Sequence, residues 1–95
     1  MPKEYGTWCQ NNLHAIAINC EYCQTRDPER NEIEDRALVR ISIVNAEKPD
    51  DLLLDTLVKP VHPITQYYTP KTGITEASLK HVKFTLIHAQ AFLQL

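Results

Sequence analysis

Hydrophobic and polar side chains alternate along two stretches of the chain with the period of a half-buried strand. From Leu13 onward, one face carries His14, Ile16, Ile18 and Cys20, and the other carries Ala15, Ala17, Asn19 and Glu21. In residues 37–45, Val39, Ile41 and Ile43 alternate with Arg40 and Ser42. A third apolar run, residues 52–60, follows a short polar turn. The pattern predicts three strands, of which the last two are antiparallel because their connection is short.

The remaining segments predict loops and short helices. Residues 24–36 hold eight charged side chains and a proline, which is typical of a solvated loop. Residues 61–73 contain two further prolines and Gly73, which disfavour both regular helix and strand pairing. Thr75 and Thr85 are good N-caps, so short helices are expected to start there. Residues 1–12 show no period and are expected to form a lead-in segment.

The last helix has a broad apolar stripe that needs a partner surface. The stripe consists of Leu86, Ala89, Phe92, Leu93 and Leu95. Three strands followed by helices form half of an α/β layer and leave a sheet edge uncovered. We therefore expect residues 13–95 to be the N-terminal half of a larger domain.

Composition says little about the class of protein. The chain has 95 residues, 43% hydrophobic and 23% charged, with a formal net charge of −2, which fits one soluble domain without a strongly basic surface. Three cysteines and no secretory leader predict an intracellular protein, nuclear or cytoplasmic. No apolar run reaches the roughly 20 residues that a membrane helix requires.

Two oxygen-bearing side chains end the first predicted strand on the same face. Asn19 and Glu21 should lie about 6.5–7 Å apart along the strand, and the alanines before them leave room above the sheet. Hard oxygen ligands suit Mg²⁺ or Mn²⁺, and a D-x-E pair is a sensible start for a two-metal site. Here Asn19 stands in the first position of the pair. An Asn and a Glu at the end of a strand are also common simply because the chain turns there.

Other candidate residues have ordinary interpretations. Cys20 and Cys23 form C-x-x-C, but no second pair exists, and residues three apart on a strand face opposite sides, so zinc is not favoured. Asp55 is interpreted as a structural hydrogen-bonding partner. The histidines are interpreted as incidental: His14, His62, His81 and His88. Four lysines after the third strand could meet phosphates, although exposed lysines mostly do not: Lys59, Lys71, Lys80 and Lys83.

Several blocks of the sequence, taken in order, resemble the first half of a DEDD-type (DnaQ-like) 3′-to-5′ exonuclease of the eukaryotic RNA exonuclease branch. They read AINCEYCQT, ALVRISIVN, LLDTLVKP, PITQYYTPKTGITEASL and TLIHAQAFL. The corresponding family patterns are A-L-D-C-E-M-C, D-T-x-V-K-P and I-x-x-Y-x-T-x-x-S-G-I-T. The resemblance implies an α/β, ribonuclease H-like fold that begins with three antiparallel strands followed by helices.

The resemblance also implies a chemistry. In this family the D-x-E carboxylates and later acidic residues hold two magnesium ions, which act with a His to release nucleoside monophosphates from the 3′ end of single-stranded RNA or DNA. By position, Glu21 would ligate metal, and Asn19 stands where the Asp should be. Tyr22 and Cys23 would lie beside the terminal nucleotide. The pocket for its base and sugar would be lined by Gly73, Ile74 and Thr75.

Two departures limit what the resemblance implies. Asn19 keeps the shape of Asp but lacks its charge, so divalent metal should bind less well. The second and third motifs of the family do not occur within the sequence. We therefore expect a fragment or inactive form of a metal-dependent exonuclease, completed by the remainder of the domain. The alternative is a non-catalytic nucleic-acid-binding or scaffolding module that keeps the pocket.

Overall fold

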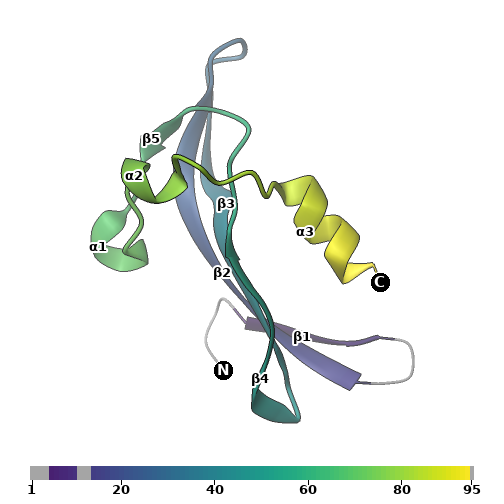
Figure 1. The fold of residues 1–95 in the computed structure, drawn as a ribbon. Coiled ribbons are helices and arrows are strands. Elements are labelled where there is room, and N and C mark those ends of the chain that lie inside the picture. Colours follow the sequence, from purple (N-terminus) through teal and green to yellow (C-terminus); the bar gives the residue numbers. More distant parts are fainter. Residues whose placement is uncertain (1–4, 11–13, 95) are drawn as a thin grey trace.

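One twisted antiparallel sheet forms the body of the molecule (Figure 1). The computed structural model describes residues 5–10 and 14–94. The strands are β1 (Tyr5–Gln10), β2 (His14–Asp27), β3 (Glu32–Asn45) and β4 (Lys48–Leu57) in that order across the sheet, and β5 (Ile64–Gln66) pairs with β2. The helices that follow are α1 (Thr69–Thr72), α2 (Glu76–Leu79) and α3 (Leu86–Leu93). The architecture is therefore α/β with an antiparallel sheet, and the predicted antiparallel pairing of residues 37–45 with residues 52–60 is confirmed.

The long β2–β3 hairpin corrects the prediction of a loop over residues 24–36. β2 continues to Asp27, β3 begins at Glu32, and the connection is a tight turn in which Asn31 has a φ of 56°. The Asn31 amide donates to the Asp27 carbonyl (2.7 Å), and the Asp27 carboxylate accepts from the Glu29 amide (2.9 Å). The charged residues are solvated as expected, but they lie on paired strands that project beyond the helices (Figure 1).

Two further segments differ from expectation. Residues 5–10 of the predicted lead-in form β1, which pairs antiparallel with β2, while residues 1–4 and 11–13 lie outside the described part of the chain. The region of residues 61–73 contains β5 and the one-turn helix α1, although its prolines disfavour both. Pro70 is tolerated because it lies in the first turn of α1, where its missing amide costs no hydrogen bond.

The predicted helix starts are confirmed. The Thr75 amide donates to Ser78 Oγ (3.1 Å), and the Ser78 amide donates to Thr75 Oγ1 (3.4 Å), a reciprocal cap of α2. At α3 the Thr85 amide donates to His88 Nδ1 (2.9 Å). His88 is therefore a capping residue, which corrects its interpretation as incidental.

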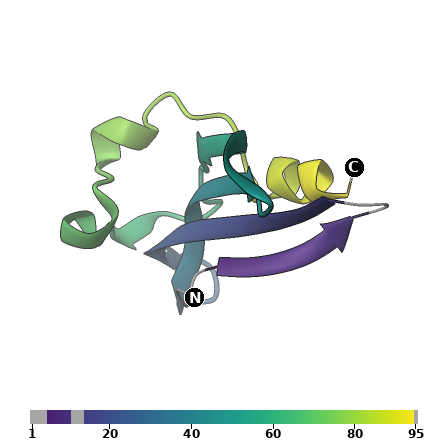
Figure 2. The ribbon, with the colours of Figure 1, turned by 90° about the horizontal axis from the view of Figure 1, so that it is seen from below.

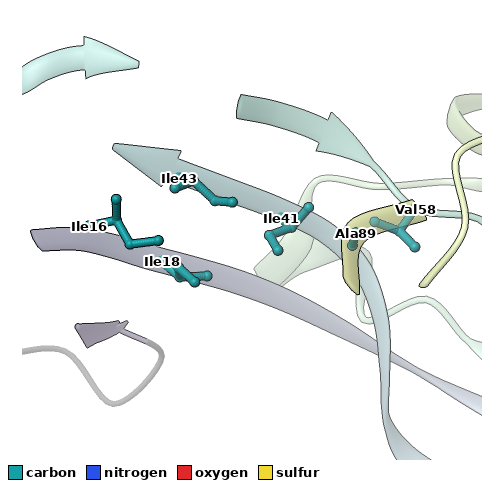
Figure 3. Packing of buried hydrophobic residues seen from close by; sticks show 6 residues of the cluster. All are labelled: Ile16, Ile18, Ile41, Ile43, Val58 and Ala89. Atoms are coloured by element: carbon teal, nitrogen blue, oxygen red, sulfur yellow. The ribbon is translucent and has the colours of Figure 1, made fainter. Parts of the chain in front are cut away.

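The larger apolar cluster, here called cluster one, joins β2 and β3 to α3. Figure 3 shows that Ile16 and Ile18 of β2 project beside Ile41 and Ile43 of β3, with Val58 and Ala89 farther along the same side. Phe92 and Leu93 of α3 pack against this cluster. The alternation read from the sequence thus gives the face that α3 covers, except at Val39. Val39 packs in the second apolar cluster instead, because the register between β2 and β3 shifts between Glu21 and Tyr22.

The smaller cluster, cluster two, lies toward α2. Its buried residues are Cys23, Val39, Ile74 and Leu79. Cys23 is two positions beyond Glu21, so it lies on the opposite face of β2 from Ile16 and Ile18. Figures 1 and 2 show the corresponding arrangement, with α1 and α2 on one side of the hairpin and α3 on the other.

Candidate functional site

Asn19 and Glu21 share the face of β2 that cluster one does not use. Both are half-buried, whereas Ile16 and Ile18, on the opposite face of β2, are buried. On β3, Ser42 lies opposite Asn19 and Arg40 lies opposite Glu21. The structure therefore places the two residues of the N-x-E pattern side by side above the sheet, next to polar neighbours.

The edge of β2 is open at Glu21. β1 pairs with β2 as far as Asn19, and the pairing with β5 begins at Gln24, so residues 20–23 have no strand partner on this edge within the described chain. A cavity of about 410 Å³ opens here. It is lined by Cys20, Glu21, Tyr22, Asp35, Arg36, Tyr68, Lys71 and Thr72. Its far wall is α1, the segment that leads directly into Gly73.

A β-bulge in β3 brings two charged residues to this cavity. Cys23 pairs with Ala37 and Thr25 with Glu34, so Gln24 alone faces both Asp35 and Arg36. Bulges re-aim side chains and are frequent beside functional sites. Sequence analysis missed both residues because they fall in the segment interpreted as a loop.

A hydrogen-bond network ties this bulge to α1. The Asp35 carboxylate accepts from Gln24 Nε2 (2.6 Å) and from the Tyr68 hydroxyl (3.2 Å). Thr65 Oγ1 donates to Gln24 Oε1 (2.9 Å). Desolvation, reinforced by the bond to Asp35, raises the pKa of Tyr68. Tyr68, the residue before α1, has a φ of 53°, which is strained for an aromatic residue, and the network holds it in that conformation.

The segment that follows α1 is a closed turn. Gly73 has a φ of 72°, a conformation that other residues adopt only with strain, and its amide donates to the Thr69 carbonyl (2.7 Å). The Ile74 amide donates to Thr72 Oγ1 (3.0 Å), and Thr69 Oγ1 donates to the Ile74 carbonyl (2.7 Å). Thr72 thus supplies a hydroxyl where the family pattern has Ser.

The predicted substrate-binding residues divide into two groups. Tyr22 lines the Glu21 cavity, and the Arg36 guanidinium lies 5.3 Å from its ring centroid. Cys23 and Ile74 are 0% and 4% exposed and pack together in cluster two, so their side chains are closed to solvent. Gly73 and Thr75 are exposed but do not line this cavity, and neither does Asn19. Their roles toward a substrate stay predictions.

Cys20 and Cys23 point to different clusters, Cys20 to cluster one and Cys23 to cluster two. Burial raises the pKa of both thiols, which disfavours the thiolate that metals and electrophiles need. The C-x-x-C pattern therefore follows from strand packing.

Asp55 is held by Arg40 in a bidentate pair. Arg40 Nε donates to Asp55 Oδ1 (3.0 Å) and Arg40 Nη2 to Asp55 Oδ2 (2.9 Å). These bonds lower the pKa of Asp55 and raise that of Arg40, which the Glu21 charge raises further. The interpretation of Asp55 as a structural partner is confirmed. Because both of its oxygens are engaged, Asp55 is a poor additional metal ligand.

The described residues supply only part of the ligand set that a divalent-metal site needs. Glu21 offers one carboxylate and Asn19 one neutral amide oxygen. Across residues 15–94, no three His, Cys, Asp or Glu side chains converge in a way that could hold an ion. A two-metal centre would need ligands from outside this part of the chain.

None of the helices in the described ranges is both long and apolar enough to cross a membrane.

Comparison with known proteins gives relatives named exonucleases. The chain is 34% identical over 83 residues to an uncharacterized exonuclease of Schizosaccharomyces pombe, a match covering 87% of this chain and 12% of that protein. It is 35% identical over 77 residues to exonuclease GOR of Pan troglodytes, covering 81% and 10%. It is 36% identical over 66 residues to RNA exonuclease 1 of Saccharomyces cerevisiae, covering 70% and 10%.

These matches concern a limited part of the relatives, since the chain spans about a tenth of their length. No protein-family model matches the chain, and no solved structure matches it. The similarity to several proteins named exonucleases supports a relationship to an exonuclease family.

Proposed function

We propose that this chain supplies the first-motif strand and the substrate turn of a ribonuclease H-like, 3′-to-5′ exonuclease that acts on the ends of single-stranded RNA. One observation carries the proposal: Glu21 opens onto a cavity whose far wall is α1, which leads into the Gly73–Thr75 turn. Two segments far apart in sequence, each matching a separate family pattern, therefore meet at one place. The similarity to RNA exonuclease 1 favours RNA over DNA as the substrate class.

The proposal includes magnesium as the cofactor. Glu21 and the amide oxygen of Asn19 would hold the ion on this side, with the remaining ligands supplied by the rest of the domain. When bound, Mg²⁺ ions would activate water and stabilise the leaving oxygen. The neutral Asn19 weakens such a site because it removes one charge from the ligand set. We infer that this form of the domain is catalytically inactive or strongly impaired.

A second candidate function follows from the same incomplete set of metal-ligating side chains. A module that keeps the cavity and the turn but lacks the charge at position 19 could bind nucleic acid without cutting it. The incomplete ligand set is the observation that favours this binding module.

Reversing the substitution separates the two functions. In a full-length version of the protein, Asn19→Asp should raise the rate of Mg²⁺-dependent trimming of a 5′-labelled single-stranded RNA by on the order of 100-fold or more. Asn45→Asp is the matched control, because it makes the same change at the far end of β3. A single-stranded DNA of the same sequence tests the substrate class, and a ladder shortening from the 3′ end tests polarity.

The possible results of this experiment distinguish the two candidate functions. Activity that appears only with Asn19→Asp and vanishes with EDTA supports the impaired exonuclease. RNA binding without cleavage in either form supports the binding module, and the absence of both cleavage and binding contradicts both candidates.

A further inference from the structure

Two cations line the Glu21 cavity without a carboxylate partner. Most arginines of the described chain are engaged: Arg26 donates to Asn31, Arg30 lies 4.0 Å from Glu32, and Arg40 is paired with Asp55. By contrast, among the described residues no ion pair or side-chain hydrogen bond engages the Arg36 guanidinium or the Lys71 ammonium. Cations without a carboxylate partner on two walls of one cavity favour an anionic ligand.

The two cations come from different elements and are held by different means. Arg36 lies in the bulge of β3, with its guanidinium over the Tyr22 ring. Lys71 lies in the single turn of α1, opposite the strand that carries Glu21. The volume of about 410 Å³ falls in the range typical of small-ligand sites.

The acidic residues of the cavity define which anion fits. Asp35 accepts hydrogen bonds from Gln24 and Tyr68, which hold its carboxylate against α1 but leave its charge. Glu21 and Asp35 therefore both oppose an anion, and the two cations must outweigh them. A phosphate group has the geometry for the planar fork of Arg36, with Lys71 as a point charge on its other side. The rings of Tyr22 and Tyr68, which line the same cavity, offer apolar contact to a nucleobase.

We propose that Arg36 and Lys71 form a subsite for a backbone phosphate of a single-stranded nucleic acid whose end lies beside Glu21. The identity of the ligand rests on the proposed function, but the subsite does not require catalysis or metal. Because Glu21 repels the phosphate, neutralising Glu21 should strengthen phosphate binding even when no divalent ion is present.

Binding of a mononucleotide to the ¹⁵N-labelled chain tests the subsite. In EDTA, uridine 5′-monophosphate should bind more tightly than uridine and should shift the amide signals of Arg36, Lys71 and Thr72. Arg36→Gln and Lys71→Gln should each weaken monophosphate binding by about 3–5-fold, in line with a charge contact made by an exposed side chain, and leave uridine binding unchanged. Lys83→Gln, which changes an exposed lysine outside the lining of this cavity, is the matched control.

Salt dependence gives a readout that a structural role would not change. For a single-stranded oligoribonucleotide, each lost phosphate contact should lower the slope of log affinity against log salt by about 0.7. Arg36→Lys and Lys71→Arg should keep the slope near that of the parent chain, because they preserve the charge. The amide spectra of all variants report directly whether they are folded.

The results distinguish this inference from the proposed function. Equal binding of uridine and its monophosphate, or equal losses in Lys83→Gln and Lys71→Gln, would overturn the subsite. In EDTA, Glu21→Gln should strengthen monophosphate binding, and the absence of any gain in affinity would also contradict the subsite. A phosphate preference in EDTA, together with no Mg²⁺-dependent trimming by the full-length Asn19→Asp protein, would keep the subsite and contradict the exonuclease part of the proposed function.

Discussion

Cluster one and cluster two are both apolar, but they stabilise different parts of the molecule. Cluster one connects the two longest strands to α3 and lies on the face away from Glu21. Cluster two contains fewer buried residues and holds the turn after α1 against Cys23, two residues from Glu21. The comparison indicates that the sheet depends mainly on cluster one, whereas the geometry of the candidate site depends mainly on cluster two.

The largest expected effect is in cluster one. Ile43 is fully buried, so Ile43→Ala should lower the free energy of unfolding by about 3–4 kcal/mol, through lost apolar burial and the cavity left behind. Urea denaturation followed by circular dichroism measures the loss, and Ile43→Val, expected to cost about 1 kcal/mol, is the graded control. In the fraction that remains folded, monophosphate affinity should equal that of the parent chain.

The same substitution in cluster two should have a more local effect. Ile74 is 4% exposed, and Ile74→Ala should lower the global free energy of unfolding by about 2–3 kcal/mol. It should also speed hydrogen exchange of the Gly73 and Ile74 amides more than that of the β2–β3 amides, because the turn can open by itself. Monophosphate affinity should fall in the folded protein. Uniform acceleration of exchange along both elements would remove the distinction between the clusters.

The parts of the fold with simple periodicity were predictable from the sequence. Alternation identified the inner residues of cluster one, and threonine caps located the starts of α2 and α3. The hairpin tip was missed because eight charged residues look like a loop, although solvent-exposed strands tolerate charge on both faces. β1 and β5 were missed because each is short and depends on the edge of β2 for its pairing.

The candidate site was predictable only in part. The alternation of β2 put Asn19 and Glu21 on one face, and family resemblance pointed to the turn at Gly73. Nothing in the local sequence predicts the bulge that brings Asp35 and Arg36 to the cavity, because a bulge depends on the register between two strands. The hydrogen bond from Tyr68 to Asp35 is likewise a contact between distant segments.

Removing the cap of α2 should have a smaller effect than either core substitution. Thr75→Ala removes the side-chain acceptor for the Ser78 amide and should cost about 1 kcal/mol. Thr75→Ser keeps the hydroxyl and should cost less than half as much. If Thr75 also contacts a nucleotide, Thr75→Ala should weaken monophosphate binding beyond the effect of Ser78→Ala, which perturbs the same cap without changing residue 75. Equal binding by the two variants would limit Thr75 to capping.

The smallest expected effect concerns the pair beside Glu21 that belongs to neither cluster. Arg40 and Asp55 have side chains that are 43% and 32% exposed, so their pair should contribute only about 0.5 kcal/mol at neutral pH. Since Arg40 lowers the pKa of Asp55 in the folded chain, this contribution is present above the unfolded pKa of about 3.9 and is lost as pH falls through the folded value.

Arg40→Gln should therefore reduce stability at pH 7 and flatten the decline in urea midpoint below about pH 4. Lys48→Gln, an exposed change on the same sheet, should leave the decline as it is in the parent chain. Asp27, whose pKa is lowered mainly by the Glu29 amide, keeps its own acid-sensitive contribution in both variants, so the decline should not vanish. A profile for Arg40→Gln that parallels the parent at every pH would show that Arg40 does not stabilise the charged form of Asp55.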